Sequence, residues 1–114
     1  MQYEELTAGS IRISKDPLKR RPHKFTGLFQ YTVNQNAASV AANVTGLESF
    51  TIAGVKATDK VIGIKPPALP ANLGLGQPYV SADNTVIVPL INPTAGALDP
   101  AAGDWTFVII ASDE

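Results

Sequence analysis

Reactive side chains are few in this chain of 114 residues, and their types restrict the chemistry that it can perform. There is no cysteine, so thiol nucleophiles, thiolate metal sites and disulfides are excluded. The single histidine, His23, lies in the basic segment Arg20-Arg-Pro-His-Lys24, where no second His or Cys is present to share a metal ion. Nothing nearby completes a Ser/His/Asp arrangement, so we expect His23 to be a solvated side chain.

Carboxylates are sparse, and most of them fall in segments expected to be turns: Asp59, Asp83, Asp99 and Asp104. Turns favour aspartate because its side chain accepts hydrogen bonds from the backbone that follows it. A paired-carboxylate hydrolase site is therefore not expected. We predict that the protein is not an enzyme, with no catalytic residue, no cofactor and no metal ion.

Two further patterns have structural explanations. The segment Leu73-Gly-Leu-Gly-Gln-Pro78 is similar to a glycine-rich phosphate loop, but Pro78 prevents a helix from following directly and no Lys-Ser/Thr pair comes after it. It is expected to be a loop. Lys65-Pro-Pro-Ala-Leu-Pro70 is either a ligand for a proline-binding domain or a stiff connection between two sheets, and a β protein favours the connection.

Positive charge is concentrated near the N-terminus. Residues 1–24 carry six cations against three carboxylates, 6 - 3 = +3, and the remaining residues carry three against seven, 3 - 7 = -4. Cations could contact phosphates, but aromatic residues do not alternate with these cations and the whole chain has a net charge of -1. We therefore expect these cations to bind an acidic protein surface and not a nucleic acid. The six cations are Arg12, Lys15, Lys19, Arg20, Arg21 and Lys24.

The elements that must position these residues are predicted to be strands. Nine Gly and nine Pro interrupt any long helix. Residues 1–36 show no sustained period and carry Pro17 and Pro22, which indicates an extended N-terminal arm. Residues 37–114 alternate short β-prone runs with turns, which indicates a small antiparallel β-sandwich or barrel-like body. The expected strands are Ser39–Val44, Glu48–Val55, Lys60–Lys65, Tyr79–Ala82, Thr85–Ile91 and Asp104–Ala111.

Two of these strands are apolar on both faces. Along Trp105–Ile110, Val108 and Ile110 lie opposite the face of Trp105, and Thr85–Ile91 shows a similar pattern. A body of about 80 residues has one sandwich core, which covers only one face of each strand. We predict that Val108 and Ile110 form an interface between copies of the chain. The alternative is a central strand covered by loops and by the arm.

No membrane partner is expected. The longest apolar run, Val86–Ile91, is too short to cross a bilayer, and the N-terminus lacks the basic and apolar regions of a signal peptide. The sequence thus indicates a soluble protein. The lack of cysteine favours a reducing compartment, or an assembly in which neighbours supply stability.

Four phrases resemble a group of small structural proteins of tailed bacteriophages. They are Val61-Ile-Gly-Ile-Lys-Pro-Pro-Ala-Leu-Pro-Ala-Asn-Leu73, Tyr79-Val-Ser-Ala-Asp-Asn-Thr-Val86, Asn92-Pro-Thr-Ala-Gly96 and Asp99-Pro-Ala-Ala-Gly-Asp-Trp-Thr-Phe107. The resemblance covers residues 47–110, which excludes the arm. It implies a virion component without catalytic residues: a capsid decoration or cement protein, a head fibre, or part of a tail adhesin, commonly a homotrimer.

We therefore predict a capsid decoration protein, made in the host cytoplasm and located on the capsid surface of the virion. The arm combines cations with apolar groups, a mixture suited to a partner surface, and is expected to bind the major capsid protein. A receptor- or glycan-binding β module of a phage fibre or tail is the alternative. The residues expected to contact the capsid are Arg12, Lys15, Lys19, Arg20, Arg21, Lys24, Phe25 and Phe29.

Overall fold

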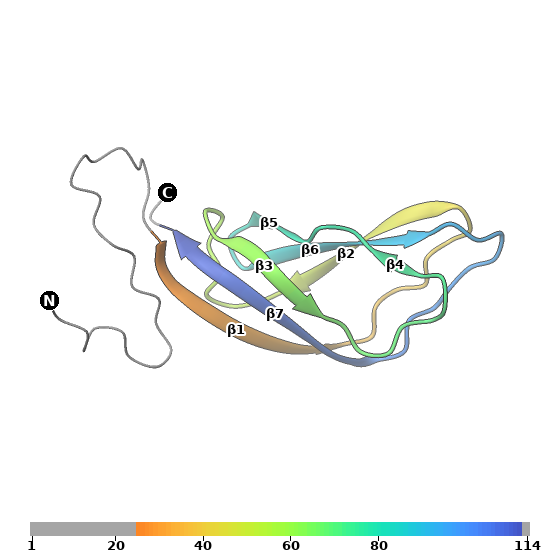
Figure 1. Cartoon of the computed structure of the whole chain (residues 1–114), viewed down its shortest axis with the longest axis horizontal. Coiled ribbons are helices and arrows are strands. Elements are labelled where there is room, and N and C mark those ends of the chain that lie inside the picture. Colours follow the sequence, from red (N-terminus) through yellow and green to blue (C-terminus); the bar gives the residue numbers. More distant parts are fainter. Residues whose placement is uncertain (1–24, 113–114) are drawn as a thin grey trace, which may run out of the picture.

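A computed structural model of the chain describes residues 25–112, and these contain seven strands and no helix (Figure 1). The strands form two sheets in which every pairing is antiparallel. One sheet has the order β1-β7-β3, and the other has the order β2-β6-β4, with β5 also paired to β6. The predicted all-β, sandwich-like body is confirmed. The strands are β1 (Phe25–Gln35), β2 (Val44–Thr51), β3 (Lys60–Lys65), β4 (Gly74–Leu75), β5 (Tyr79–Ala82), β6 (Thr85–Asn92) and β7 (Gly103–Ser112).

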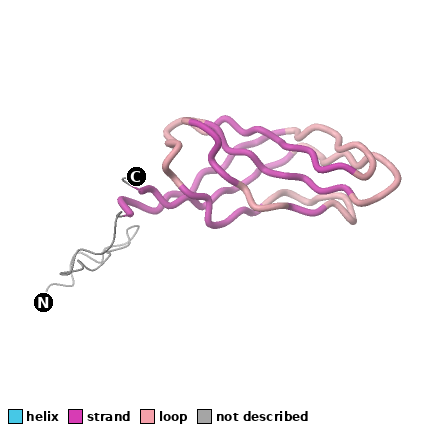
Figure 2. Tube along the Cα trace, turned by 90° about the horizontal axis from the view of Figure 1, so that it is seen from above, coloured by secondary structure: helices cyan, strands magenta, loops and turns pink. Residues whose placement is uncertain are grey.

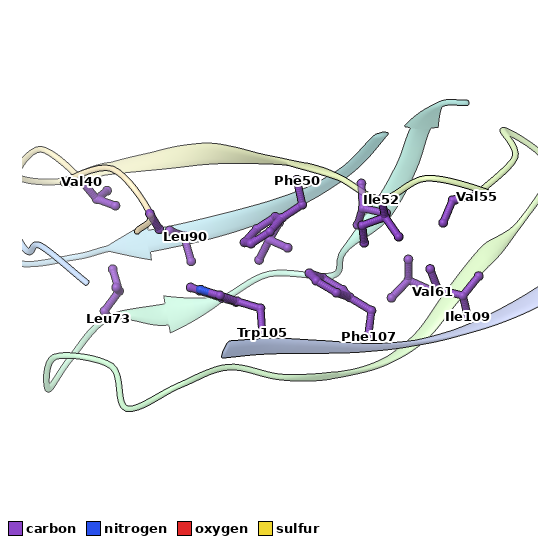
Figure 3. Close-up of a cluster of buried hydrophobic side chains, with 13 residues drawn as sticks. Val40, Phe50, Ile52, Val55, Val61, Leu73, Leu90, Trp105, Phe107 and Ile109 are labelled. Atoms are coloured by element: carbon purple, nitrogen blue, oxygen red, sulfur yellow. The ribbon is translucent and has the colours of Figure 1, made fainter. Parts of the chain in front are cut away.

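The core lies between the two sheets and is built from alternate residues of the central strands. Phe50 on β2 has its ring centroid 5.0 Å from that of Trp105 and 5.1 Å from that of Phe107, both on β7 (Figure 3). All three side chains are fully buried. Burial of such a side chain stabilises the fold by roughly 1.5–3 kcal/mol, so this aromatic cluster is a main source of cohesion between the sheets. On the β2-β6-β4 sheet, the core is extended by Val86, Val88 and Leu90 of β6.

Most of the predicted strands have the expected positions. β3 and β5 have the predicted bounds, and β6 and β7 are longer than predicted by one or two residues. The strand predicted at Ser39–Val44 is wrong in its first part, because that part forms only an isolated bridge between Val40 and Leu98. The bounds expected for the strand Glu48–Val55 are wrong, because β2 begins at Val44 and ends at Thr51, before a turn in which Gly54 has φ of 98°. The segment expected to be a loop at Leu73–Pro78 contains the two-residue strand β4.

The predicted end of the arm at residue 36 is wrong, because the last part of that segment is a strand. β1 pairs with β7 in a register that runs from Phe25↔Ser112 to Gln35↔Gly103. Residues 29–34 alternate between apolar and polar types, but a bulge between Phe25 and Gly27 interrupts the period before this stretch. The body therefore begins by Phe25. Residues 1–24, the rest of the expected arm, lie outside the described residues.

Candidate interaction surfaces

Acidic side chains in the body act in turns and strand pairs. Asp59 Oδ2 accepts a hydrogen bond from the Lys56 amide at 3.0 Å, and Asp83 Oδ1 accepts one from the Ala57 amide at 2.8 Å. Asp83 lies in a turn, as predicted, but its side chain binds a different loop, and Asp59 binds backbone that precedes it rather than backbone that follows. Asp104, which was expected at the point where a turn meets the strand Asp104–Ala111, lies inside β7 and accepts a hydrogen bond from Asn34 Nδ2 of β1 at 2.9 Å.

Within residues 25–112, no group of three or more His, Cys, Asp or Glu side chains is placed to hold a metal ion. The same residues contain no helix that is long and apolar enough to cross a membrane.

The phrase Asn92–Gly96, one of the four that carry the family resemblance, is a structural clamp. The buried Asn92 side chain donates to the carbonyls of Val40, Ala41 and Gly96 at 2.9–3.1 Å. Its Oδ1 accepts from the amide and the hydroxyl of Thr94 at 2.9 and 2.7 Å. One side chain thus fastens the loop after β6 to the connection between β1 and β2.

A second clamp is formed by Asn84 in the turn between β5 and β6. This residue has φ of 64°, a left-handed conformation that Asn tolerates, and the expected hairpin at Ser81–Thr85 is confirmed. Asn84 Oδ1 accepts a hydrogen bond from the Gly54 backbone amide at 2.9 Å. The backbone amide of Asn84 donates a hydrogen bond to the Val55 carbonyl at 2.7 Å. Both phrases therefore have structural roles at opposite ends of β6.

The predicted interface residues Val108 and Ile110 lie on the outer face of the β1-β7-β3 sheet, opposite the core. Both are half-buried within one copy. Ile110 is in register with Leu28 on β1 and Lys60 on β3, whereas Val108 is in register with Gln30 and Gly63. An added Cβ at Gly63 would lie 3.5 Å from Val108 Cβ, so this part of the face is closely packed. The neighbouring strands thus supply part of the cover that the sequence analysis assigned to another copy.

Phe25 and Phe29, which the sequence assigns to capsid contact, lie at the start of β1. Here the paired ends of β1 and β7 project past the rest of the body (Figures 1 and 2). The two side chains are 49% and 47% exposed. An added Cβ at Gly27 would lie only 2.7 Å from the Phe29 ring, which shows that this ring lies across the glycine backbone. The six cations assigned to the same contact lie outside the described residues.

A further apolar surface lies on the outer face of the β2-β6-β4 sheet, and the sequence analysis did not assign site residues to it. We call it the uncharged face, and it consists of Leu47, Tyr79, Ile87, Pro89 and Ile91. Register places Leu47 opposite Pro89 and Tyr79 opposite Ile87, so the five side chains form one continuous group across three strands. The doubly apolar pattern of Thr85–Ile91 indicated that this strand needs a second cover, but only the pairing shows which residues join it.

Charge separates the two outer faces. The strand residues that share the uncharged face with its apolar members are Ser, Thr, Ala and Gly, with no ionisable group: Thr45, Ser49, Thr51, Gly74, Ala82 and Thr85. The outer face of the β1-β7-β3 sheet instead carries Lys60, Lys65 and Asp104, in register with Ile110, Thr106 and Asn34.

No protein-family model, curated protein or solved structure matches the chain.

Proposed function

We propose that the chain is a structural protein of a tailed-bacteriophage virion, and that it decorates the capsid. In this proposal the segment 1–24 attaches it to the major capsid protein, and the β body associates with other copies, as a homotrimer in the arrangement that the resemblance implies. The observation that supports this most is a sandwich with apolar residues on both outer faces. Large exposed apolar patches on a small domain are typical of surfaces that bind other proteins.

Charge supports the attachment step. Residues 1–24 carry +3, whereas the described residues carry three lysines against five carboxylates, 3 - 5 = -2. The basic segment joins the body at Phe25, the first residue of the edge strand β1. A partner that pairs acidic groups with the segment therefore also meets the exposed rings of Phe25 and Phe29, which would fill shallow apolar pockets.

The alternative function, a receptor- or glycan-binding module of a fibre or tail, rests on one observation. Tyr79 is 44% exposed and lies on a face rich in hydroxyl groups, a setting in which an aromatic ring can stack on a sugar. Trp105 and Phe107 are buried in the core, and so they offer nothing to such a ligand. A titration with host-surface glycans would favour this alternative if Tyr79→Ala abolished binding.

Attachment is tested on purified particles that lack the protein. Full-length protein is added at about 0.1 M and 1 M salt, between which the screening length falls from about 10 to 3 Å, and bound protein is quantified after sedimentation. Arg20→Glu with Arg21→Glu should weaken binding several-fold at low salt, and the loss should shrink at high salt. The matched control, Lys60→Glu with Lys65→Glu, makes the same change of charge on exposed body residues and should leave binding unchanged. Absence of the protein from the virion would refute the proposal.

A further inference from the structure

We infer that further copies of this chain cover the uncharged face, so that Leu47, Pro89 and their neighbours form the contact between copies. This inference develops the self-association part of the proposed function and does not depend on attachment to a capsid. It also places the contact on the opposite sheet from Val108 and Ile110, the residues that the sequence predicts for it.

Three apolar side chains of this face are exposed, and on β3 of the other sheet Ile62 is 57% exposed. Leu47 is 62% exposed, Tyr79 44% and Ile91 39%, whereas Val108 and Ile110 are half-buried by their own neighbours. Ile87 and Pro89 lie between the exposed members on the central strand β6. Exposed apolar groups in one continuous patch, rather than scattered singly, indicate a contact surface.

The chemistry of the face favours a copy of itself. Two copies that meet through it bring no like charges together, because none of its strand residues carries a charge at neutral pH. Its polar groups are hydroxyls, which both donate and accept hydrogen bonds and can therefore pair with identical groups: Thr45, Ser49, Thr51 and Thr85. The same contact through the other sheet would have to bury charged groups, because that face carries Lys60, Lys65 and Asp104.

The size of the face predicts a weak contact. β6 has eight residues, which at about 3.3 Å each span roughly 26 Å, and three strands at about 4.8 Å span roughly 14 Å. The flat area, roughly 360 Å² before side-chain relief is counted, is below the roughly 800 Å² that each partner contributes to a standard interface. We therefore expect dissociation in the micromolar range. Copies held side by side on a particle would associate more fully, because attachment raises their effective concentration.

Sedimentation of the full chain over roughly 1–500 µM, a range that brackets micromolar affinity, tests the inference. Wild-type protein should self-associate as the concentration rises, either face to face as a dimer or around a common axis as a trimer. Leu47→Lys should raise the dissociation constant at least tenfold. Ile62→Lys is the matched control, since Ile62 is 57% exposed on β3 of the other sheet, and it should leave association unchanged. A monomeric wild type at the highest concentration would overturn the inference, as would dissociation by Ile110→Lys but not by Leu47→Lys.

Oxidative crosslinking gives a second measurement, which does not depend on whether the lysine variant folds. Because the chain has no cysteine, L47C introduces a single thiol on the proposed contact. It should form intermolecular disulfides much faster than I62C, and equal rates for the two variants would contradict the inference. Protein that crosslinks through L47C but is absent from virions would refute the proposed function alone. Protein found on virions but monomeric in solution would refute this inference alone.

Discussion

Removal of the Asn92 side chain should destabilise the body far more than its single position suggests. The two Nδ2 hydrogens are shared among three carbonyl oxygens, Oδ1 accepts two hydrogen bonds, and the residue is 1% exposed. Some partners keep another bond, since the Val40 carbonyl also accepts from the Leu98 amide and the Gly96 carbonyl also accepts from the Thr94 hydroxyl. With about 1 kcal/mol for each bond that is not replaced, Asn92→Ala should cost about 3 kcal/mol.

This loss is large compared with the stability expected for the body. The 88 described residues correspond to roughly 4–13 kcal/mol, and a loss of about 3 kcal/mol lowers Tm by roughly 12–24 °C. Thermal and urea unfolding, followed by circular dichroism, would measure the change. The matched control is Asn34→Ala, which removes one exposed hydrogen bond to Asp104 and should cost less than about 1 kcal/mol. If Asn92→Ala stayed within that same range, the clamp described above would be wrong.

Asn92→Asp adds a dependence on pH. The new carboxyl would be buried close to three carbonyl oxygens, which disfavours its charged form and raises its pKa above the unfolded value. A raised folded-state pKa means that stability is lost as pH rises past the unfolded value of about 4. The free energy of unfolding of Asn92→Asp should therefore fall further below the wild-type value at neutral pH than in mild acid. For Asn92→Ala the difference from wild type should change little with pH. Equal deficits for Asn92→Asp at both pH values would refute the buried placement of this side chain.

The remaining predictions concern the start of the body and one close approach. A variant lacking residues 1–24 keeps all seven strands and should unfold cooperatively, whereas one lacking residues 1–36 loses β1 and exposes the edge of β7, so its circular dichroism should show no cooperative transition. Gly103→Ala should cost roughly 1–3 kcal/mol in urea unfolding, because its Cβ would lie 2.5 Å from Pro67 Cβ. Gly96→Ala, where nothing lies within 4 Å of the added Cβ, should be close to neutral, and equal losses for the two variants would contradict the packing described.

The class of fold could be predicted from the sequence because its signals are local. Gly and Pro exclude long helices, and short β-prone runs between turn signals mark β3, β5, β6 and β7, whose bounds depend on a few neighbouring residues. The same is true of the hairpin at Asp83-Asn84, because Asn tolerates the left-handed conformation without help from the rest of the fold. The position of Asp83 in this turn was recognisable for the same reason.

The composition of the surfaces was decided by tertiary structure, because the pairing of two distant strands leaves little trace in the local sequence of either strand. β1 was taken for an arm because a bulge interrupts its alternation, and only its register with β7, some 80 positions away, makes it a strand. Strands that are apolar on both faces indicated that their outer faces need to be covered, but not which outer face stays exposed. Val108 and Ile110 receive part of their cover from β1 and β3, whereas pairing of β2 and β5 with β6 gathers Leu47, Tyr79 and Ile87 into an open apolar face. Local composition determines that such a face exists, and long-range register determines which residues compose it.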